Sequence, residues 1–401
     1  MTTGTALALA LTAGLSVANV YFAQPLLDQM AAAFSIPPAH AGLVVTLTQI
    51  GYGLGLIFLV PLGDLVDRRK LVIALTSLSA AALLVVAKAN AKTVLMVAMA
   101  IVGLLAVNAQ VAVAFAATQA SSHERGKALG IVTSGVVIGI LAARSIAGVL
   151  TDLGSWRTVY LTSAAVMVVI TVLLGCVIPS LTPTAPNEGY LSSLRSMPIL
   201  FLRDRVLLLR GILALLIFAT FSAFWTTLVL PLSAAPFSYS HTEIGLFGLV
   251  GLAGAVAATF AGKLADRGHA QSTTGYSLVL LVLSWELIAL LPQSIPTLLI
   301  GILLLDLSVQ AVHVTNQSII LTRHPEASSR LVGGYMVFYS VGSAAGATTS
   351  TIAYSEAGWL GVSALGAAYS AAGLLVWILS LKFSVLHDGD IAFHGEPERR
   401  P

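Results

Sequence analysis

Long runs of apolar residues, each about the length of one membrane crossing, dominate the chain. A bilayer core about 30 Å thick needs about 20 apolar residues in a helix. Runs of that length, separated by charges, prolines and turn residues, predict twelve helices at 5–30, 40–62, 71–88, 93–119, 127–151, 157–178, 210–235, 242–262, 271–291, 296–322, 330–354 and 358–383. The alternating segments of about ten residues that build membrane barrels do not occur. The sequence therefore predicts an all-α membrane protein with twelve transmembrane helices.

The composition argues against a soluble protein and against a nucleic-acid-binding protein. Of 401 residues, 57% are hydrophobic and only 9% are charged, whereas soluble chains carry roughly 25% charged residues. So few charges cannot cover a soluble globule, and the net charge of +3 is spread too thinly to indicate a nucleic-acid partner. The expected surroundings are a lipid bilayer. Because Cys176 is the only cysteine, an internal disulfide is excluded.

The Lys and Arg residues predict the orientation of the helices, because cytoplasmic loops carry an excess of them. With a cytoplasmic N-terminus, the cytoplasmic loops and tails would hold Arg68, Arg69, Lys70, Arg125, Lys127, Arg195, Arg203, Arg205, Arg210, Lys263, Arg267, Arg323, Arg330, Lys382, Arg399 and Arg400. The opposite loops would hold only Lys88, Lys92 and Arg157. Both termini are therefore expected in the cytoplasm.

Polar stretches divide the chain into four regions. Six helices fall in residues 1–178 and six in 210–383, with a connection at 179–209 and a polar tail at 384–401. The connection opens with three prolines, and arginines then alternate with leucines and isoleucines. It is either an amphipathic helix on the cytoplasmic membrane surface or a plain linker. The tail is expected to be disordered.

The two sets of six helices repeat one another. Gly63, Asp67 and Arg68 recur 199 residues later as Gly262, Asp266 and Arg267. At an offset of 203 residues, Gly42, Gly51, Gly130, Gly139 and Trp156 recur as Gly245, Gly254, Gly333, Gly342 and Trp359. Because six is even, both halves begin on the same side of the membrane, so the repeat is parallel. Such halves hold a substrate site between them near the midplane.

One loop motif occurs in both halves. It reads Gly63-Asp64-Leu65-Val66-Asp67-Arg68-Arg69-Lys70 after the second helix and Gly262-Lys263-Leu264-Ala265-Asp266-Arg267-Gly268-His269 after the eighth. Both copies resemble the Gly-x-Leu-x-Asp-Arg-x-Gly-Arg-Lys signature of the major facilitator superfamily, and the resemblance covers nearly the whole chain. It implies a monomeric bacterial transporter of the inner membrane, similar to the efflux permeases.

The same resemblance implies a gating role for this motif. Glycine allows close approach of a helix end, and the acid can cap a helix or pair with an Arg in one state only. In the family the cluster latches the outward-open state. The residues that carry this role here would be Gly63, Asp64, Asp67, Arg68, Arg69, Gly262, Asp266 and Arg267.

The fifth predicted helix matches the antiporter signature of the family only in part. Gly126, Gly135 and Gly139 fit the pattern Gly-x8-Gly-x3-Gly-Pro-x2-Gly-Gly, but Ile140 stands at the Pro and Ala143-Arg144 at the closing Gly-Gly. The match favours export by proton antiport. The departures keep open an alternative, uptake of a sugar, nucleoside or organic anion by symport or uniport.

Polar residues inside the predicted membrane helices mark candidate functional positions, because a charge at the bilayer centre costs about 2.5–3.5 kcal/mol on insertion scales. The tenth helix carries Asp306, Gln310, His313 and Gln317, which fall within about 60° of one helix face. In the resembled family the first, fourth, seventh and tenth helices line the cavity. We therefore expect Asp306 or His313 to take a proton; hydrogen bonding between helices is the alternative.

The first helix carries a second polar face, formed by Tyr21, Gln24 and Asp28, with Pro25 expected to kink it. Arg144 lies in the fifth helix at a similar depth to Asp28. It could pair with Asp28, bind an anionic substrate or extend its charged end to the membrane surface. Further candidates for the cavity are Gln49, Asn108, Gln110, Trp225, Tyr335 and Tyr339.

No motif for enzymatic chemistry is present. The sequence lacks a Gly-x-x-x-x-Gly-Lys-Ser/Thr phosphate loop and clustered His/Cys metal spacing. The expected function is transport of a small organic solute by alternating access, without a cofactor and driven by the proton gradient. A membrane sensor or scaffold that does not transport is the alternative from another class.

Overall fold

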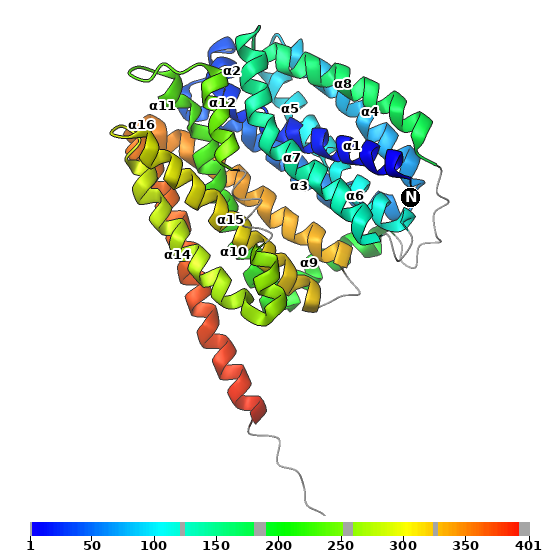
Figure 1. The fold of residues 1–401 in the computed structure, drawn as a ribbon, viewed down its shortest axis with the longest axis vertical. Helices are drawn as coiled ribbons and strands as arrows, with labels where there is room; N and C mark the ends of the chain where they lie inside the picture. The colour runs from blue at the N-terminus through cyan, green and yellow to red at the C-terminus, as the bar shows by residue number, and fades with distance from the viewer. Residues whose placement is uncertain (1, 121–124, 180–189, 252–259, 324–327, 393–401) are drawn as a thin grey trace, which may run out of the picture.

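Two bundles of helices, one from each half of the chain, lie side by side in the computed structural model (Figure 1). The structure describes residues 2–120, 125–179, 190–251, 260–323 and 328–392, and among these no strand occurs. The expectations for Gly254 and for the prolines at 183 and 186 lie outside the described residues. The predicted all-α class is confirmed.

The first half forms the bundle that runs from blue through cyan to blue-green in Figure 1. Its elements are α1 (Thr3–Tyr21), η1 (Gln24–Leu26), α2 (Leu27–Ala33), η2 (Pro38–His40), α3 (Leu43–Phe58), η3 (Val60–Asp64), α4 (Arg68–Ala87), α5 (Lys92–Ala106), α6 (Asn108–Gln119), α7 (Arg125–Asp152) and α8 (Trp156–Val177).

The second half forms the green-to-red bundle, and α9 (Tyr190–Arg203) precedes it. Its elements are α10 (Arg205–Thr227), α11 (Val229–Ser233), α12 (His241–Val250), the π-helical η4 (Ala265–His269), α14 (Ala270–Ala289), α15 (Ile295–Arg323) and α16 (Ser328–Ala392).

These elements match the predicted helices in number and place. Ten stretches of the described chain are long and apolar enough to cross a membrane. The last of them contains two predicted helices, since α16 has non-helical backbone at Ala357 and Gly358. The eighth predicted helix corresponds to α12 and to helical residues 260–264. The helix of α16 continues to Ala392, beyond the predicted start of the tail.

Pro25 breaks the first membrane helix as predicted. The α-helix ends at Tyr21, a 3₁₀ turn with Pro25 near its start follows, and α2 begins at Leu27. A proline ring clashes with the preceding helical turn and removes one backbone donor. Gln24 is buried, whereas Asp28 is partly exposed near one end of the molecule, which we call the Asp28 end. The opposite end is called the α9 end.

Glycines set the spacing of helices inside each half. A Cβ atom on Gly139 of α7 would collide with the backbone of Gly14 in α1, and one on Gly342 of α16 would collide with Leu215 in α10. Gly139 and Gly342 are equivalent positions of the sequence repeat. Each lets the fifth helix of its half contact the first, so the repeat seen in the sequence reflects one packing rule used twice.

The same symmetry joins the two halves. Gly42 of α3 lies against the backbone of Ala347 in α16, and its repeat partner Gly245 of α12 lies against Arg144 in α7. We call these two contacts the α3–α16 seam and the α7–α12 seam. Thr46 extends the first seam by donating to the Ala344 carbonyl at 3.1 Å. Both seams lie toward the Asp28 end, so the halves meet closely there.

The connection between the halves contains a helix, α9. Its Phe201 and Met197 are buried, and both approach Gly334 at the start of α16. The hydroxyl of Tyr190 donates to the Phe58 carbonyl of the first half at 2.9 Å. The segment therefore packs against both halves.

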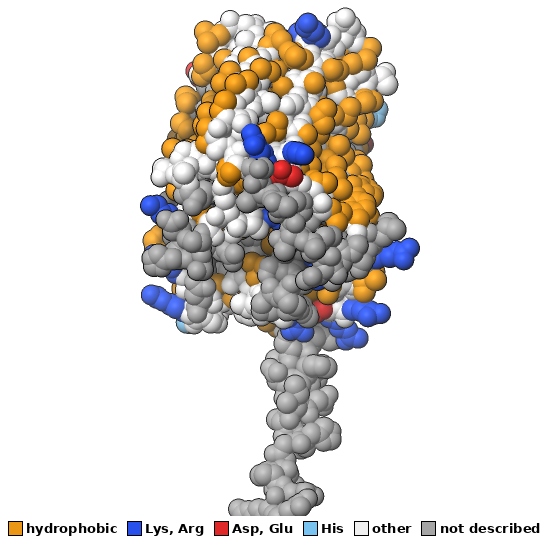
Figure 2. All heavy atoms as spheres, turned by 90° about the vertical axis from the view of Figure 1, so that its right-hand side faces the viewer, with side chains coloured by type: hydrophobic (Ala, Val, Ile, Leu, Met, Phe, Trp, Pro, Cys, Tyr) orange, Lys and Arg blue, Asp and Glu red, His pale blue; other side chains and the backbone are white. Residues whose placement is uncertain are grey.

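Apolar side chains cover much of the outer surface (Figure 2). Val169 and Val172 of α8 are 66% and 64% exposed, and Leu360 of α16 is 72% exposed. Such a surface would aggregate in water. It fits the acyl chains of a bilayer, in agreement with the predicted membrane protein.

Substitution of Gly103 should reveal how closely α3 and α5 pack. A Cβ there would collide with the Thr48 backbone, so Gly103→Ala should lower stability by about 1–3 kcal/mol. Gly175 of α8 is the control, because a Cβ there meets nothing within 4 Å. Thermal unfolding of both purified variants measures the difference, and equal midpoints would contradict the proposed close packing.

Candidate functional site

The polar residues predicted inside the membrane converge where the two halves meet. Tyr21 and Gln24 come from the broken first helix and Arg144 from α7, all in the first half. Trp225 of α10 and Asp306 of α15 come from the second half. We call these five residues the central cluster, and each is at least 95% buried.

Arg144 is the cationic group of the cluster. Its Nε and Nη2 atoms donate to Oε1 of Gln24 at 3.2 and 2.9 Å. The guanidinium carbon lies 3.9 Å from the ring centroid of Trp225 and 5.3 Å from that of Tyr21. A guanidinium over an aromatic face is stabilised by the ring quadrupole, more strongly where water is excluded. Arg144 is thus held inside the protein and does not extend toward the membrane surface.

Trp225 joins Arg144 to Asp306. The face of the indole lies under the guanidinium, while its Nε1 donates to Oδ1 of Asp306 at 3.1 Å. Gly251, which directly follows α12, leaves room for this carboxylate, since a Cβ there would lie 2.6 Å from Oδ2. Opposite charges on different halves are therefore linked through one ring, and Coulomb attraction at low dielectric adds to that link.

Aromatic hydroxyls extend the cluster toward α16. The hydroxyls of Tyr21 and Tyr339 are hydrogen-bonded across the two halves. Tyr339 packs edge-on against Tyr52 at 6.2 Å, and Gln110 donates to the Tyr52 hydroxyl at 3.4 Å. Three predicted residues, Tyr21, Tyr339 and Gln110, thus belong to one connected network.

The polar face predicted for the tenth helix is present on α15. Nδ1 of His313 lies 3.0 Å from the Tyr335 hydroxyl, and Nε2 lies 3.3 Å from Nε2 of Gln317. The Phe218 ring packs against the imidazole at 5.2 Å. Gln310 is half-buried on the same helix. Asp306 and His313 therefore face α10 and α16, not lipid.

The structure corrects the pairing predicted for Arg144. Asp28 contacts His241 of the second half at 3.0 Å, and Gln24 takes the place next to Arg144. Asp28 lies four residues beyond Gln24, in α2 on the far side of the 3₁₀ turn. Of the alternatives open for Arg144, the ion pair with Asp28 is not present in this structure.

Two other candidates have structural partners. Asn108 donates to the Thr76 hydroxyl at 2.8 Å between α6 and α4, wholly within the first half. Gln49 is buried in the α3–α16 seam, where the Ser340 hydroxyl donates to its backbone carbonyl. Neither residue touches the central cluster through these contacts.

Three titratable residues that the sequence did not single out as site candidates lie at contacts between helices. His241 and Asp152 face each other across the halves, and Arg210 is only 1% exposed, with Nη1 donating to Asn316 at 3.1 Å. The position of Arg210 inside an apolar run could have signalled its burial. No sequence signal connects His241 with Asp28 or Asp152, because they are far apart in the chain.

The first copy of the loop motif makes several contacts at the α9 end of the first half. Asp67 caps α4 by accepting from the Arg69 amide at 2.9 Å. Arg68 donates from Nε to the Gly63 carbonyl at 2.7 Å and from Nη1 to Ala114 at 3.0 Å. In the second copy, Gly268 adopts a left-handed φ of 83°. The side chains of Asp64 and Asp266 lie outside the described residues, and Arg267 is exposed.

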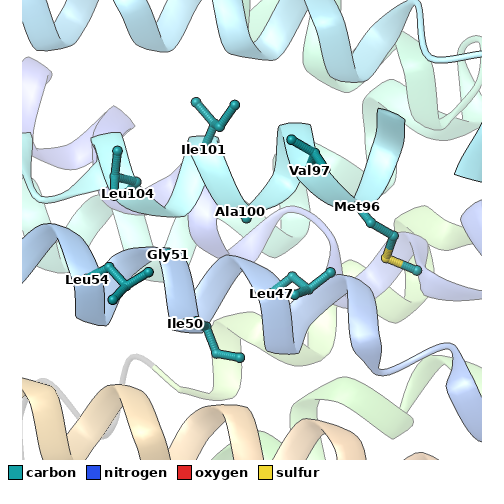
Figure 3. A pocket seen from close by; sticks show the side chains of 9 residues that line it. All are labelled: Leu47, Ile50, Gly51, Leu54, Met96, Val97, Ala100, Ile101 and Leu104. Atoms are coloured by element: carbon teal, nitrogen blue, oxygen red, sulfur yellow. The ribbon is translucent and has the colours of Figure 1, made fainter. Parts of the chain in front are cut away.

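A groove on the outer surface is separate from the central cluster (Figure 3). It lies between α3 and α5, measures about 260 Å³ and is lined only by apolar residues: Leu47, Ile50, Gly51, Leu54, Met96, Val97, Ala100, Ile101 and Leu104. Several of these side chains are exposed where lipid would lie. Without a polar group, the groove cannot orient a solute.

Comparison with known proteins identifies relatives that cover most of the chain. The sequence profile of the Major Facilitator Superfamily matches residues 9–233 and 210–392. A putative uncharacterized transporter of Escherichia coli K12, YgaY, is 44% identical over 92% of this chain and 93% of its own length. The probable transporter SCO4007 of Streptomyces coelicolor is 31% identical over 91% of this chain and 85% of its own.

Solved structures agree on the fold. The nucleoside transporter NupG superposes with a TM-score of 0.75 at 13% identity, covering 94% of this chain and 99% of that one. A bacterial homologue of the lysosomal transporter Spinster gives a TM-score of 0.73 at 13% identity, with 98% of both chains covered. At this identity the likeness concerns the fold alone.

Replacing Trp225 should test its link to Asp306. Trp225→Phe keeps an aromatic face but removes the donor to a buried carboxylate, which should cost about 1–3 kcal/mol of stability. Trp377→Phe is the matched control, because Trp377 donates to Gln271 at the surface and its loss should cost less than about 0.5 kcal/mol. Thermal unfolding compares the two; equal losses would contradict a special role for Trp225.

Proposed function

Because the chain belongs to the Major Facilitator Superfamily and is a membrane transporter, not an enzyme, we propose that it exports a small organic solute in exchange for protons. The two halves would rock around the central cluster and open alternately toward each side of the membrane. Transporters of this family need no cofactor. The proton gradient would supply the energy, and a monomer would suffice.

The observation that carries this proposal is the Arg144–Trp225–Asp306 link. It holds a buried cation of one half against a buried carboxylate of the other. Protonation of Asp306 would remove one of the two charges and weaken the connection between the halves. A carboxylate in this position can therefore couple proton binding to movement of the halves.

The cluster also offers the features of a binding site. Aromatic rings of Tyr21, Phe221 and Trp225 surround the guanidinium of Arg144 and could hold the apolar part of a solute. His313, hydrogen-bonded to Tyr335, is the second candidate for a proton.

Uptake of an organic anion is a second candidate function, and Arg144 favours it. The guanidinium donates to a neutral amide, Gln24, and could exchange this partner for a carboxylate of a substrate. The departures Ile140 and Ala143-Arg144 from the antiporter signature point the same way. Flux measured under imposed pH gradients of both directions separates export from uptake.

Asp306→Asn should uncouple transport from the proton gradient. The expected result is that the proton gradient stimulates flux about tenfold less than in the wild type. A tenfold effect lies within the usual range of the free energy that couples two binding sites in a protein. Vesicles containing the full chain would be assayed with a cationic dye, ethidium, and an anionic dye, carboxyfluorescein. These probes also report which solute charge is preferred.

Glu286→Gln is the control for this experiment, because Glu286 is an exposed carboxylate on α14. It should leave the stimulation unchanged. Normal gradient stimulation in a folded Asp306→Asn variant would contradict the proposed role of Asp306.

The orientation is a second prediction. The distribution of Lys and Arg favours a cytoplasmic C-terminus. A C-terminal green fluorescent protein should therefore fluoresce, while a C-terminal alkaline phosphatase should be inactive. Active phosphatase at that terminus would contradict the assigned orientation.

A further inference from the structure

A histidine lies between two carboxylates where the halves meet at the Asp28 end. Nε2 of His241 is 3.0 Å from Oδ1 of Asp28, and its Nδ1 is 3.6 Å from Oδ1 of Asp152. His241 begins α12 in the second half, whereas α2 and α7 of the first half supply the acids. A neutral imidazole carries one N–H, but an imidazolium carries two and can satisfy both carboxylates.

Asp152 makes additional contacts with the start of α12. Its carboxylate accepts from the His241 amide at 3.2 Å and from the Thr242 amide at 2.7 Å. The first amides of a helix have no partner within the helix, and its dipole favours a negative charge there. The first half therefore supplies a cap for a helix of the second half.

These contacts form the last layer of the α7–α12 seam. A Cβ on Gly148 would collide with the His241 carbonyl, so the backbones touch directly beside the charged groups. Side-chain exposure is 11% for His241, 22% for Asp28 and 31% for Asp152. Solvent at the Asp28 end can thus exchange protons with the group, and this end cannot open while the contacts persist.

We propose that Asp28, His241 and Asp152 form a proton-dependent latch that holds the Asp28 end closed when His241 is protonated. The proposal builds on the alternating access proposed above. With the predicted orientation, the latch would sense the pH outside the cytoplasm.

The sign of the pH dependence follows from the contacts. The hydrogen bond to Asp28 and the charges of both acids outweigh burial and raise the pKa of His241 above its ordinary value of 6.5. Stabilisation of the closed end is therefore complete below the ordinary pKa and is lost as pH rises through the raised one. One unit of pKa difference corresponds to about a tenfold change in the closed-to-open ratio.

Other charged groups on the elements packed against α12 lie further along it or are already bonded. The Arg144 side chain approaches α12 at Gly248, and Asp306 approaches Gly251 just after the end of α12, so both lie beyond the first turn that contains His241. Glu243 bonds to Ser240 within the capping box of α12. These charged groups are the side chains of Arg144 in α7, Asp306 in α15 and Glu243 in α12. The other two elements that pack against α12, α11 and η1, carry no charged residue.

The distance between the halves at this end tests the latch. Spin labels would be attached to the full chain at Leu153→Cys in the first half and Gln293→Cys in the second, both exposed, with Cys176→Ser removing the native thiol. Double electron–electron resonance would measure the distance between the labels in lipid nanodiscs from pH 5.5 to 8. In the otherwise wild-type chain, the population with long distances should grow as the pH rises.

Two substitutions should alter this profile in opposite ways. His241→Gln should give long distances at every pH, because no positive charge remains between the carboxylates of Asp28 and Asp152. His241→Lys should give short distances at every pH, because its charge does not titrate in this range. His40→Gln, at an exposed histidine of the same end, should retain the wild-type profile.

A wild-type pH profile in either folded His241 variant, or a wild type insensitive to pH, would overturn the latch. The outcome of the dye-flux experiment is independent of the outcome of the distance measurement. Dye flux that ignores the proton gradient, together with an intact pH profile of distances, would contradict proton exchange and support the latch. If the proton gradient drives dye flux but the His241 variants keep the wild-type pH profile of distances, the latch alone would be contradicted.

Discussion

Direct backbone contact between the two halves is the constraint on which the rest of the structure depends. In the α7–α12 and α3–α16 seams, glycines stand where any side chain would collide, as Gly245 does against Arg144. Because the backbones touch, side chains beside the seams are brought within hydrogen-bonding distance across the halves. The central cluster lies along this contact and the His241 group at its end, so both depend on the same approach of helices.

Burial of charge in an apolar bundle then dictates the chemistry of the centre. A charged group in the membrane interior must have partners, and the molecule supplies them through an aromatic ring and an amide. Arg144 is stabilised by Trp225 and Gln24, and Asp306 by the Trp225 N–H. Neutral or aromatic partners hold the charges without a direct ion pair between them. In such an arrangement, Asp306 can bind a proton or Arg144 can bind a solute without first breaking an ion pair between them.

Much of the fold could be predicted, because each membrane helix must satisfy its own backbone hydrogen bonds and so leaves a long apolar run in the sequence. The break at Pro25 and the equivalence of Gly139 with Gly342 were also readable, since proline and glycine act locally. The candidate site was predicted less completely. Asp306 and His313 share a helix face, which periodicity reveals, but Asn108 bonds within its own half.

The sequence by itself determined the number of helices, their order, the internal repeat and the polar face of α15. These properties follow from hydrophobic length, helical period and residue type, which act along the chain. Only the tertiary structure decided that Arg144 belongs with Gln24 and Trp225, and that Asp28 belongs with His241. Those pairings join residues on different helices, and the four residues between Gln24 and Asp28 are enough to give each a different partner.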